Sequence, residues 1–421
     1  MSKLEELIKE KCPNGVKCLS LAEIVRAVNI GINPRRFFKL NPDNASGFYV
    51  TVRELNGLKG VKRYEKTDTI NDEAIAIIGA RANIEKGDIL FSNTGTVGKL
   101  ALVLEDPKNW GVNEGIYVIK PKFDMVLSKF LYYYLDSDIA YKDYSSKFTG
   151  STLKHVTQAA LLSIKVPVPP LEVQNEIVQI LDNFAELTAE LTAELSNRKK
   201  QYEYYRDLLL NFDENEQRER VEWFTLADVC MKISSGGTPN RSRSDYYGGS
   251  IPWVRTQEVD FCDIEDVEMS ITDEGLKNSS AKWIPENCVI VAMYGATAGK
   301  SAINKIPVTT NQACCNLQVN EEIAMYKYVY YWVCREYENL KALGQGSQNN
   351  INAGVIKSYK IPIPSLEHQK YIVDMLDRFN VLTNDISEGL PAEIEAREKQ
   401  YAYYRDKLLS FKEQKVGAIN A

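Results

Sequence analysis

At 421 residues the chain is long enough for two domains of ordinary size, and its 44% hydrophobic and 26% charged residues are typical of a globular protein. The formal net charge of −6 argues against a protein that coats nucleic acid through bulk positive charge. No apolar run approaches the roughly 18 residues of a membrane helix, so we expect a cytoplasmic protein. The eight cysteines include no C-x-x-C pair and there are only two histidines, which argues against a metal site.

The first half of the chain predicts strands and turns followed by one long helix. "GDILFSNTGTVGKLALV" from Gly87 is typical of an apolar strand, a glycine turn and a Gly-Lys pair before a second strand. From Leu171 onward, apolar residues such as Ile177, Leu181 and Phe184 recur at three- and four-residue steps, which indicates a helix with one apolar stripe. If it is continuous, this helix spans about 40 residues and about 60 Å. A stripe of that length predicts a partner helix from elsewhere in the chain.

The second half repeats this plan. "KIPIPSLEHQKYIVDMLDRF" from Lys360 matches "KVPVPPLEVQNEIVQILDNF" from Lys165 at an offset of 195 residues. "KQYAYYRDKLLSF" from Lys399 matches "KQYEYYRDLLLNF" from Lys200 at an offset of 199, so the second copy carries four extra residues between these anchors. The intervening "SEGLPAEIEAR", with its glycine and proline, predicts a break in the second helix. A period near 200 residues indicates tandem domains.

These patterns predict an α/β (α+β) fold with a pseudo-twofold internal repeat. We expect two globular mixed domains separated by two long antiparallel helices that form a coiled-coil spacer. The expected boundaries are 1–166 for the first domain, 167–213 for the first spacer helix, 214–361 for the second domain, 362–413 for the second spacer helix and 414–421 for a C-terminal tail. The tandem unit "ELTAELTAEL" from Glu186 either sets the spacer length through its copy number or is simply helix-forming sequence.

Several segments together resemble one protein family. They are "SGGTPNRSRSDYYGGSIPWVRTQEV", "GATAGK", "NQACCNLQV", "IPIPSLEHQKYIVDMLDRF" and "GLPAEIEAREKQYAYYRDKLLSF", with weaker counterparts in the first half. In this order they resemble the specificity subunit of type I restriction-modification systems over essentially the whole chain. The resemblance implies that each variable region is a target-recognition domain that reads one half of a split double-stranded DNA site. The chain would then direct adenine methylation and restriction by partner subunits.

The resemblance also implies partners for the repeated helices. Two modification (methyltransferase) subunits would dock on them, restriction subunits would join the complex, and S-adenosylmethionine and ATP would bind the partners, leaving this chain without a cofactor. An internal twofold repeat independently favours two similar docking surfaces, and paired readers suit half-sites about one DNA turn, or a multiple of it, apart. The candidate spacer and partner-binding residues are Tyr202, Tyr205, Arg206, Leu209, Phe212, Tyr401, Tyr404, Arg405, Leu408 and Phe411.

Arg, Lys, Asn and Gln can contact base edges, while Arg, Lys and backbone amides contact phosphates. The candidate DNA-binding residues of the first domain are Arg35, Arg36, Lys39, Arg53, Lys62, Arg63, Lys99 and Lys154. Those of the second are Asn240, Arg241, Arg243, Arg255, Gln257, Lys282, Lys300, Gln348 and Asn349. Any single one could equally be a solvated surface side chain, so the prediction concerns the groups collectively. The acidic excess is expected on the outer faces of the domains or on the spacer.

Two enzymatic interpretations compete with this one. "GATAGKS" from Gly295 has three residues between its glycines, whereas a phosphate loop needs four, so we expect a turn that presents a lysine to DNA or an ordinary structural turn. A methyltransferase needs an Asn- or Asp-Pro-Pro-aromatic loop, which "NPDN" at Asn41 and "VPPL" at Val168 do not provide. We therefore expect no catalytic residues. The alternatives are a stand-alone DNA methyltransferase with a degenerate catalytic loop and a coiled-coil adaptor with no DNA preference.

Overall fold

The computed structural model describes residues 3–34, 37–150, 154–212, 221–344, 350–384 and 389–414. The chain divides into two compact units, of which unit 1 comprises Met1–Leu191 and Ile394–Ala421 and unit 2 comprises Thr192–Glu393. Each unit contains one mixed domain and two helical segments. We call the part of unit 1 from α1 to β9 domain 1, and the part of unit 2 from β10 to β20 domain 2.

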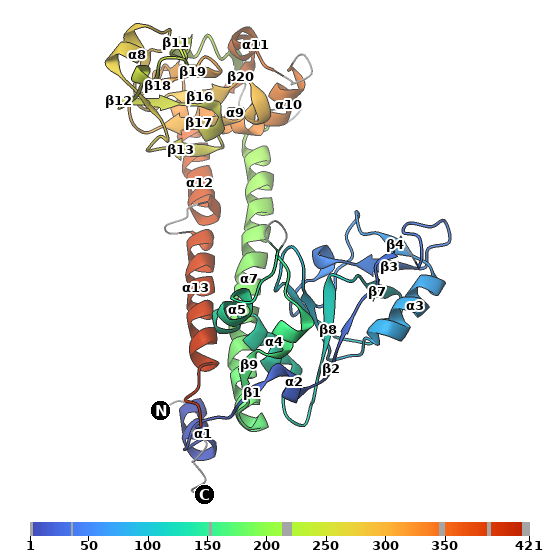
Figure 1. Ribbon diagram of the computed structural model, residues 1–421. Coiled ribbons are helices and arrows are strands. Elements are labelled where there is room, and N and C mark those ends of the chain that lie inside the picture. Colours follow the sequence, from blue (N-terminus) through green and yellow to red (C-terminus); the bar gives the residue numbers. More distant parts are fainter. Residues whose placement is uncertain are drawn as a thin grey trace, which may run out of the picture. The chain divides into compact units, whose positions relative to one another are not determined.

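Domain 1 is built around a four-stranded sheet with the strand order β2-β8-β5-β6 (Figure 1). A second sheet has the order β4-β3-β7, and β1 pairs with β9. The elements are α1 (Lys3–Lys11), β1 (Cys18–Ser20), α2 (Leu21–Ile24), β2 (Val25–Ile30), β3 (Gly47–Val50), η2 (Val52–Glu54), β4 (Thr69–Ile70), α3 (Asp72–Ala82), β5 (Ile89–Ser92), β6 (Leu100–Leu102), β7 (Trp110–Val112), β8 (Ile116–Pro121), α4 (Ser128–Leu135), α5 (Asp138–Ser145), α6 (Gln158–Leu162) and β9 (Lys165–Pro167).

Domain 2 repeats this topology with one additional strand at the edge of each sheet, β13 and β15. Its main sheet has the order β11-β19-β16-β17-β13, its second sheet the order β14-β12-β18-β15, and β10 pairs with β20. The elements are β10 (Glu222–Thr225), β11 (Cys230–Ser235), η3 (Ser244–Tyr246), β12 (Tyr247–Val254), η4 (Thr256–Glu258), β13 (Cys262–Ile264), β14 (Ser270–Ile271), α8 (Asp273–Lys277), β15 (Trp283–Ile284), β16 (Val289–Ala292), η5 (Gly295–Thr297), β17 (Ser301–Asn304), β18 (Val308–Thr310), β19 (Cys314–Val319), α9 (Tyr326–Arg335), α10 (Tyr337–Ala342), α11 (Ala353–Ser358) and β20 (Lys360–Ile363). Each second sheet contains a parallel pair, β3 with β7 in domain 1 and β12 with β18 in domain 2, which confirms the repeat.

The central strands β5 and β16 are almost entirely apolar because both faces of each main sheet are covered. In β5, Ile89 and Phe91 face a core that includes α4 and the start of α7, while Leu90 faces the second sheet and α3. In β16, Val289 and Val291 face α9 and α12, while Ile290 faces a separate small core. Alternate residues of a strand point to opposite faces, so burial on both sides requires a continuous apolar run. The run quoted from Gly87 therefore contains two strands, β5 and β6, as predicted.

The predicted long helix is α7 (Leu171–Leu209), which is 39 residues long. The predicted break is also present, because α12 (Leu366–Asn384) ends before α13 (Leu390–Leu408) begins. In unit 1 the first part of α7 runs beside α13, and in unit 2 the rest of α7 pairs with α12 (Figure 1). Within the described residues, no helix has the length and apolarity needed to cross a membrane.

Aromatic stacks join the helices of the two copies. In unit 1 the rings of Phe184 and Tyr404 stack with centroids 5.6 Å apart and an interplanar angle of 20°. In unit 2 the rings of Tyr205 and Phe379 stack at 5.4 Å and 23°. Phe184 and Phe379 are equivalent by the 195-residue offset, and Tyr205 and Tyr404 by the 199-residue offset. Each copy's phenylalanine thus meets the other copy's tyrosine, which is the reciprocal contact that a twofold interface requires.

Each helix is also anchored to its own domain by a buried glutamine. Gln174 of α7 and Gln369 of α12 are 0% exposed and lie 195 residues apart. Each side-chain amide accepts one hydrogen bond from a backbone N–H and donates two to backbone carbonyls. It thus satisfies backbone groups that have no backbone partner where the chain turns. The partners are Leu127 N, Met125 O and Pro169 O for Gln174, at 2.8 to 2.9 Å, and Met325 N, Ile323 O and Pro364 O for Gln369, at 2.8 to 3.1 Å.

A carboxylate two turns further along each helix makes a second matched anchor. Asp182 accepts hydrogen bonds from Lys129 Nζ at 2.6 Å and Tyr133 OH at 2.7 Å. In domain 2, Asp377 accepts hydrogen bonds from the equivalent lysine and tyrosine, which are Lys327 Nζ and Tyr331 OH, both at 2.6 Å. Burial, and next the hydrogen bond to the carboxylate, raise the pKa of both phenols. The two domains therefore hold their helices through the same chemistry.

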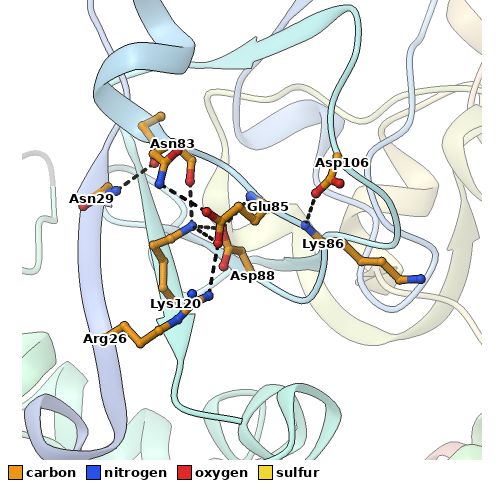
Figure 2. A network of polar contacts seen from close by, with 9 residues as sticks. Arg26, Asn29, Asn83, Glu85, Lys86, Asp88, Asp106 and Lys120 are labelled. Carbon is orange, nitrogen blue, oxygen red and sulfur yellow. Dashed lines mark hydrogen bonds and ion pairs between the residues drawn. The ribbon is translucent and has the colours of Figure 1, made fainter.

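Domain 1 contains a buried ion pair between Lys120 and Asp88, the residue that precedes β5 (Figure 2). Lys120 Nζ of β8 lies 2.6 Å from Asp88 Oδ2, and it also donates to Asn83 O at the left-handed C-cap of α3. Glu85 Oε2 joins the pair at 3.2 Å and bonds Arg26 at the solvent side. Burial raises the pKa of the Asp88 carboxyl above its ordinary value despite the ammonium beside it. The network ties α3 to the main sheet.

Candidate nucleic-acid interface

Three segments predicted to carry DNA contacts converge in domain 1. They are the 3-10 turn η2 with its cap Thr51, the glycine turn between β5 and β6, and the segment around His155. The contacts that join them are Lys99 Nζ to Val52 O at 2.8 Å, Gly95 N to Lys154 O at 3.0 Å, and Thr94 Oγ1 with His155 Nδ1 at 2.8 Å. Residues far apart in the sequence thus form one continuous surface.

The equivalent segments converge in domain 2. Thr297 Oγ1 in the glycine turn donates to Thr256 O of η4 at 2.8 Å. Ile351 N donates to Met293 O at 2.8 Å, which brings the start of the segment 350–352 to the same turn. Both domains therefore build one kind of surface from three matching segments, although the segments differ in their side chains.

The glycines of the two turns have a structural role. Gly95, Gly98, Gly295 and Gly299 all have φ between +74° and +92°, in the left-handed region that other residues disfavour. A Cβ atom on Gly98 would also lie 2.2 Å from the hydroxyl of Tyr144. The glycines are thus explained by the turn itself, and no phosphate-binding role is needed to account for them.

In domain 1 the candidate cations lie over aromatic rings and carbonyls. Lys62 Nζ is 5.1 Å from the Tyr64 ring, Arg63 lies 6.0 Å from Phe48, and Lys154 lies 5.8 Å from Phe148. Arg53 bonds Lys66 O and is 3.9 Å from Glu54, while Lys99 bonds carbonyls only. Among the described residues of the chain, Lys62, Arg63, Lys99 and Lys154 have no carboxylate partner. Lys39 is exposed, and Arg35 and Arg36 lie outside the described residues.

In domain 2, three of the five candidate cations are ion-paired instead. Lys300 Nζ bonds Asp260 Oδ1 at 2.5 Å, and Arg255 Nη2 bonds Glu268 Oε2 at 2.5 Å. Arg243 forms a two-bond pair with Asp245, at 2.6 and 2.8 Å. The remaining candidates are Asn240, whose side chain caps its own turn, the exposed Arg241, Gln257 and Lys282, and Gln348 and Asn349, which lie outside the described residues.

The acidic excess was expected on the outer faces of the domains or on the spacer, and in domain 2 part of it lies beside the candidate cations. Five of the nine residues from Asp260 to Glu268 are acidic, and two of them bond Lys300 and Arg255. The run itself was visible in the sequence. The contact of Asp260 with Lys300 was not visible in the sequence, because it depends on the pairing of strand β13 with β17, some 40 residues away.

The predicted partner-binding residues of the helices are largely used inside each unit. Tyr202, Leu209 and Phe212 pack against the domain 2 core, Tyr401, Leu408 and Phe411 pack against the domain 1 core, and Tyr205 and Tyr404 form the stacks described above. The neighbouring tyrosines point outward instead. Tyr204 is 64% exposed and Tyr403 is 61% exposed, and they are equivalent by the 199-residue offset. We did not predict them, although they stand in both repeated segments.

The two arginines of the repeated helices differ in their surroundings. The Arg405 side chain is 10% exposed and bonds Asp136 at 3.2 Å and Asp138 at 3.4 Å. Arg206, the equivalent residue, is ion-paired only with its neighbour Asp207 among the described residues. Tyr133 and Tyr331 are equivalent, because each bonds the carboxylate of its helix. Asp136 and Cys334 each follow that tyrosine by three residues, so Cys334 occupies the position of Asp136 in domain 2. Burial raises the pKa of the Asp136 carboxyl even beside Arg405.

Comparison with known proteins identifies related sequences and folds. The family model described as "Type I restriction modification DNA specificity domain" matches residues 14–199 and 218–396. The Escherichia coli type I restriction enzyme EcoR124I/EcoR124II specificity subunit is 40% identical over 299 residues, which are 68% of this chain and 71% of that protein.

Within the described residues, no group of three or more His, Cys, Asp or Glu side chains is placed to hold a metal ion.

Solved structures with a similar fold cover nearly the whole chain. One comes from a study of complex assembly and conformational transition of the type I R-M system, with a TM-score of 0.62, 19% identity and coverage of 94% of this chain and 98% of that chain. Another is the HsdS subunit from Thermoanaerobacter tengcongensis, with a TM-score of 0.50, 17% identity and coverage of 94% and 97%. At these identities the likeness concerns the fold.

Proposed function

The chain belongs to the family of type I restriction-modification specificity subunits, and on this premise we propose that it recognises a bipartite double-stranded DNA site. Each domain reads one half-site, and the pair directs adenine methylation and restriction by partner subunits. The observation that carries the proposal is the repeat of the three-segment surface, in which the glycine turn contacts the two other segments in both domains. One surface built twice with different side chains suits two half-sites of different sequence.

Direct contacts to DNA come from side chains on these surfaces. In domain 1, Lys154 belongs to one of the segments that meet at the glycine turn, and Lys62 and Arg63 lie in the loop after η2, where Lys62 N donates to Glu54 O at 2.9 Å; all three are exposed. In domain 2, Gln257 lies in η4 beside the equivalent turn and is exposed. Cations contact phosphates and fix the register, while amides and arginines contact base edges. The domain and spacer boundaries predicted from the sequence remain part of the proposal.

The repeated helices carry the partner subunits. Two modification subunits dock at equivalent places that include Tyr204 and Tyr403, and restriction subunits join the complex. The exposure of both tyrosines supports this, because tyrosine is enriched at protein interfaces and a repeated exposed ring offers two similar sites. S-adenosylmethionine and ATP bind the partners, and this chain contributes recognition without catalysis.

Mapping of methylated adenines tests the proposal directly. Genomes of cells with and without this chain should differ by one split motif, which consists of two short half-sites and an unspecified gap. Substitution of Lys62 and Arg63 by Gln should weaken methylation at that motif. If cells without this chain lost methylation at an undivided motif, or if their methylation were unchanged, the proposal would be contradicted. Binding of S-adenosylmethionine by the isolated chain would favour the methyltransferase alternative, and a complex without DNA preference would favour the adaptor.

A further inference from the structure

Equivalent segments of the two domains carry opposite charge. In domain 2 the residues between η4 and β14, 259–269, include five acidic and no basic side chains. In domain 1 the residues between η2 and β4, 55–68, include four basic and two acidic side chains. Both segments follow the same capped 3-10 turn and lead to the same strand of the second sheet. Domain 2 forms strand β13 here and domain 1 makes only the parallel bridge of Gly57 with Ala101, so the two segments occupy equivalent places and differ most in their charge.

Two carboxylates of the acidic segment hold the two cations nearest to it. Asp260 bonds Lys300 and Glu268 bonds Arg255, each at 2.5 Å. Both cationic side chains are only 23% exposed, whereas Asp260 is 59% exposed and Glu268 is 70% exposed. The carboxylates are thus the more accessible members of the two pairs. An anion that approaches from solvent meets the carboxylates before it reaches the cations.

The backbone beside Asp260 is fixed in an uncommon conformation. Phe261 has φ of +53°, although a bulky residue strongly disfavours the left-handed region. Its N–H bonds Ser301 O at 2.8 Å, and its ring lies 5.3 Å from that of Tyr337 and 5.6 Å from Lys300 Nζ. Such a conformation persists only where the surroundings determine it. The backbone that carries Asp260 is therefore held in place, which distinguishes the ion pair of Asp260 and Lys300 from a chance contact between two surface side chains.

The equivalent lysine of domain 1 has different partners. Lys99 follows Gly98 and precedes β6, as Lys300 follows Gly299 and precedes β17. Lys99 Nζ donates to Val52 O and Arg53 O, at 2.8 and 3.4 Å, and these carbonyls carry no net charge. Its positive charge is therefore not cancelled by a bound carboxylate. A lysine that already bonds a carboxylate has a much smaller field at a distance.

We propose that the acidic segment Asp260–Glu268 is an internal competitor for DNA phosphate, so that domain 2 supplies discrimination while domain 1 supplies affinity for the DNA backbone. The inference rests on the proposed function. When Lys300 exchanges Asp260 for a phosphate, the DNA releases a counterion but the freed carboxylate takes one up. Net ion release is then near zero, whereas a free lysine contributes about 0.9 to the slope of log K against log salt. Binding to unrelated DNA gains little from domain 2, which raises specificity.

The test compares charge-neutralising variants of the full chain, assembled with its modification subunits. Binding to a duplex of unrelated sequence and to a duplex with the methylated motif is measured across a salt series. Asp260→Asn should tighten binding to unrelated DNA by about threefold and steepen the salt slope by about 1, and Asp260→Asn with Glu268→Gln by about tenfold and about 2. The ratio of specific to non-specific affinity should fall correspondingly.

Glu265→Gln is the matched control, because Glu265 is exposed, lies in the same segment and bonds neither Lys300 nor Arg255. It should change the affinity by less than about twofold and leave the slope unchanged. In a Lys300→Gln background, Asp260→Asn should have no effect on the slope. Equal effects of Asp260→Asn and Glu265→Gln, or a gain that persists without Lys300, would overturn the inference. A wild-type complex with no preference for any DNA would instead overturn the proposed function.

Discussion

Domains 1 and 2 share a topology and differ in their polar groups. The strand orders match apart from the extra strands β13 and β15 of domain 2, and the glutamine and carboxylate anchors of the helices recur with nearly the same distances. Yet the buried pair of Asp88 and Lys120 has no counterpart, since the strand registers put Cys288 and Gln318 in those places. The comparison teaches that the groups which attach the helices are fixed by the repeat, while the polar interior and the charged surface of each domain vary around it.

The largest effect is expected for the buried pair that only domain 1 has. Lys120→Met leaves Asp88, which is 0% exposed, as a buried carboxylate that has lost its closest cation, and should lower the free energy of unfolding of unit 1 by about 3 kcal/mol at neutral pH. Burial already raises the pKa of Asp88, and the penalty exists only when the carboxyl is ionised. Stability should therefore recover as the pH falls through this raised pKa. Hydrogen exchange resolved by unit measures the loss.

The control for that prediction replaces Asp88 and Lys120 with the residues that stand at the equivalent positions of domain 2. Asp88→Cys with Lys120→Gln removes both charges together and should lose less stability than Lys120→Met alone. A double variant that is no better than the single one would show that the two positions are not interchangeable between domains.

The next effect should be equal in both domains. Gln174→Leu and Gln369→Leu each leave one buried N–H and two carbonyls without their side-chain partner, and each should cost about 2 kcal/mol in its own unit. Peptide-resolved hydrogen exchange near Met125 and Ile323 reports the two losses separately. Strongly unequal losses would contradict the view that the helix anchors are matched.

A smaller and unequal effect is expected for the repeated arginines. Arg405→Met removes a mostly buried guanidinium that bonds two aspartates, and should cost about 1 to 2 kcal/mol. Arg206→Met removes a pair with an adjacent exposed aspartate and should cost less than about 0.5 kcal/mol. Denaturant unfolding of both variants gives the difference. Equal costs would mean that Asp136 and Asp138 contribute little.

The smallest effect concerns the free cations of domain 1. Lys62→Gln with Arg63→Gln should reduce the salt slope of DNA binding by about 2 and weaken binding by about tenfold, because each removes one phosphate contact. Lys300→Gln, which removes a lysine of domain 2 that already bonds Asp260, serves as the comparison. Equal effects of Lys62→Gln and Lys300→Gln on the salt slope, each measured alone, would contradict the assignment of backbone affinity to domain 1.

Parts of the candidate site followed from the sequence and parts did not. The matching glycine turns were predicted from their spacing, and the structure joins them to the neighbouring candidate segments in both domains. The exposure of Tyr204 and Tyr403 was not predicted, although the adjacent tyrosines were named. Neighbouring helix residues point in different directions, and the apolar stripe alone did not fix which ring would face the core.

The sequence by itself determined the internal repeat, the 39-residue helix α7 and the break before α13, because these depend on local periodicity and on glycine and proline. Only the tertiary structure decided which cations stay free for a ligand. The pairing of β13 with β17 brings Asp260 to Lys300, and no equivalent carboxylate reaches Lys99 among the residues described. Ion pairing falls off within a few ångströms, so it depends on strand register and side-chain direction that composition does not specify.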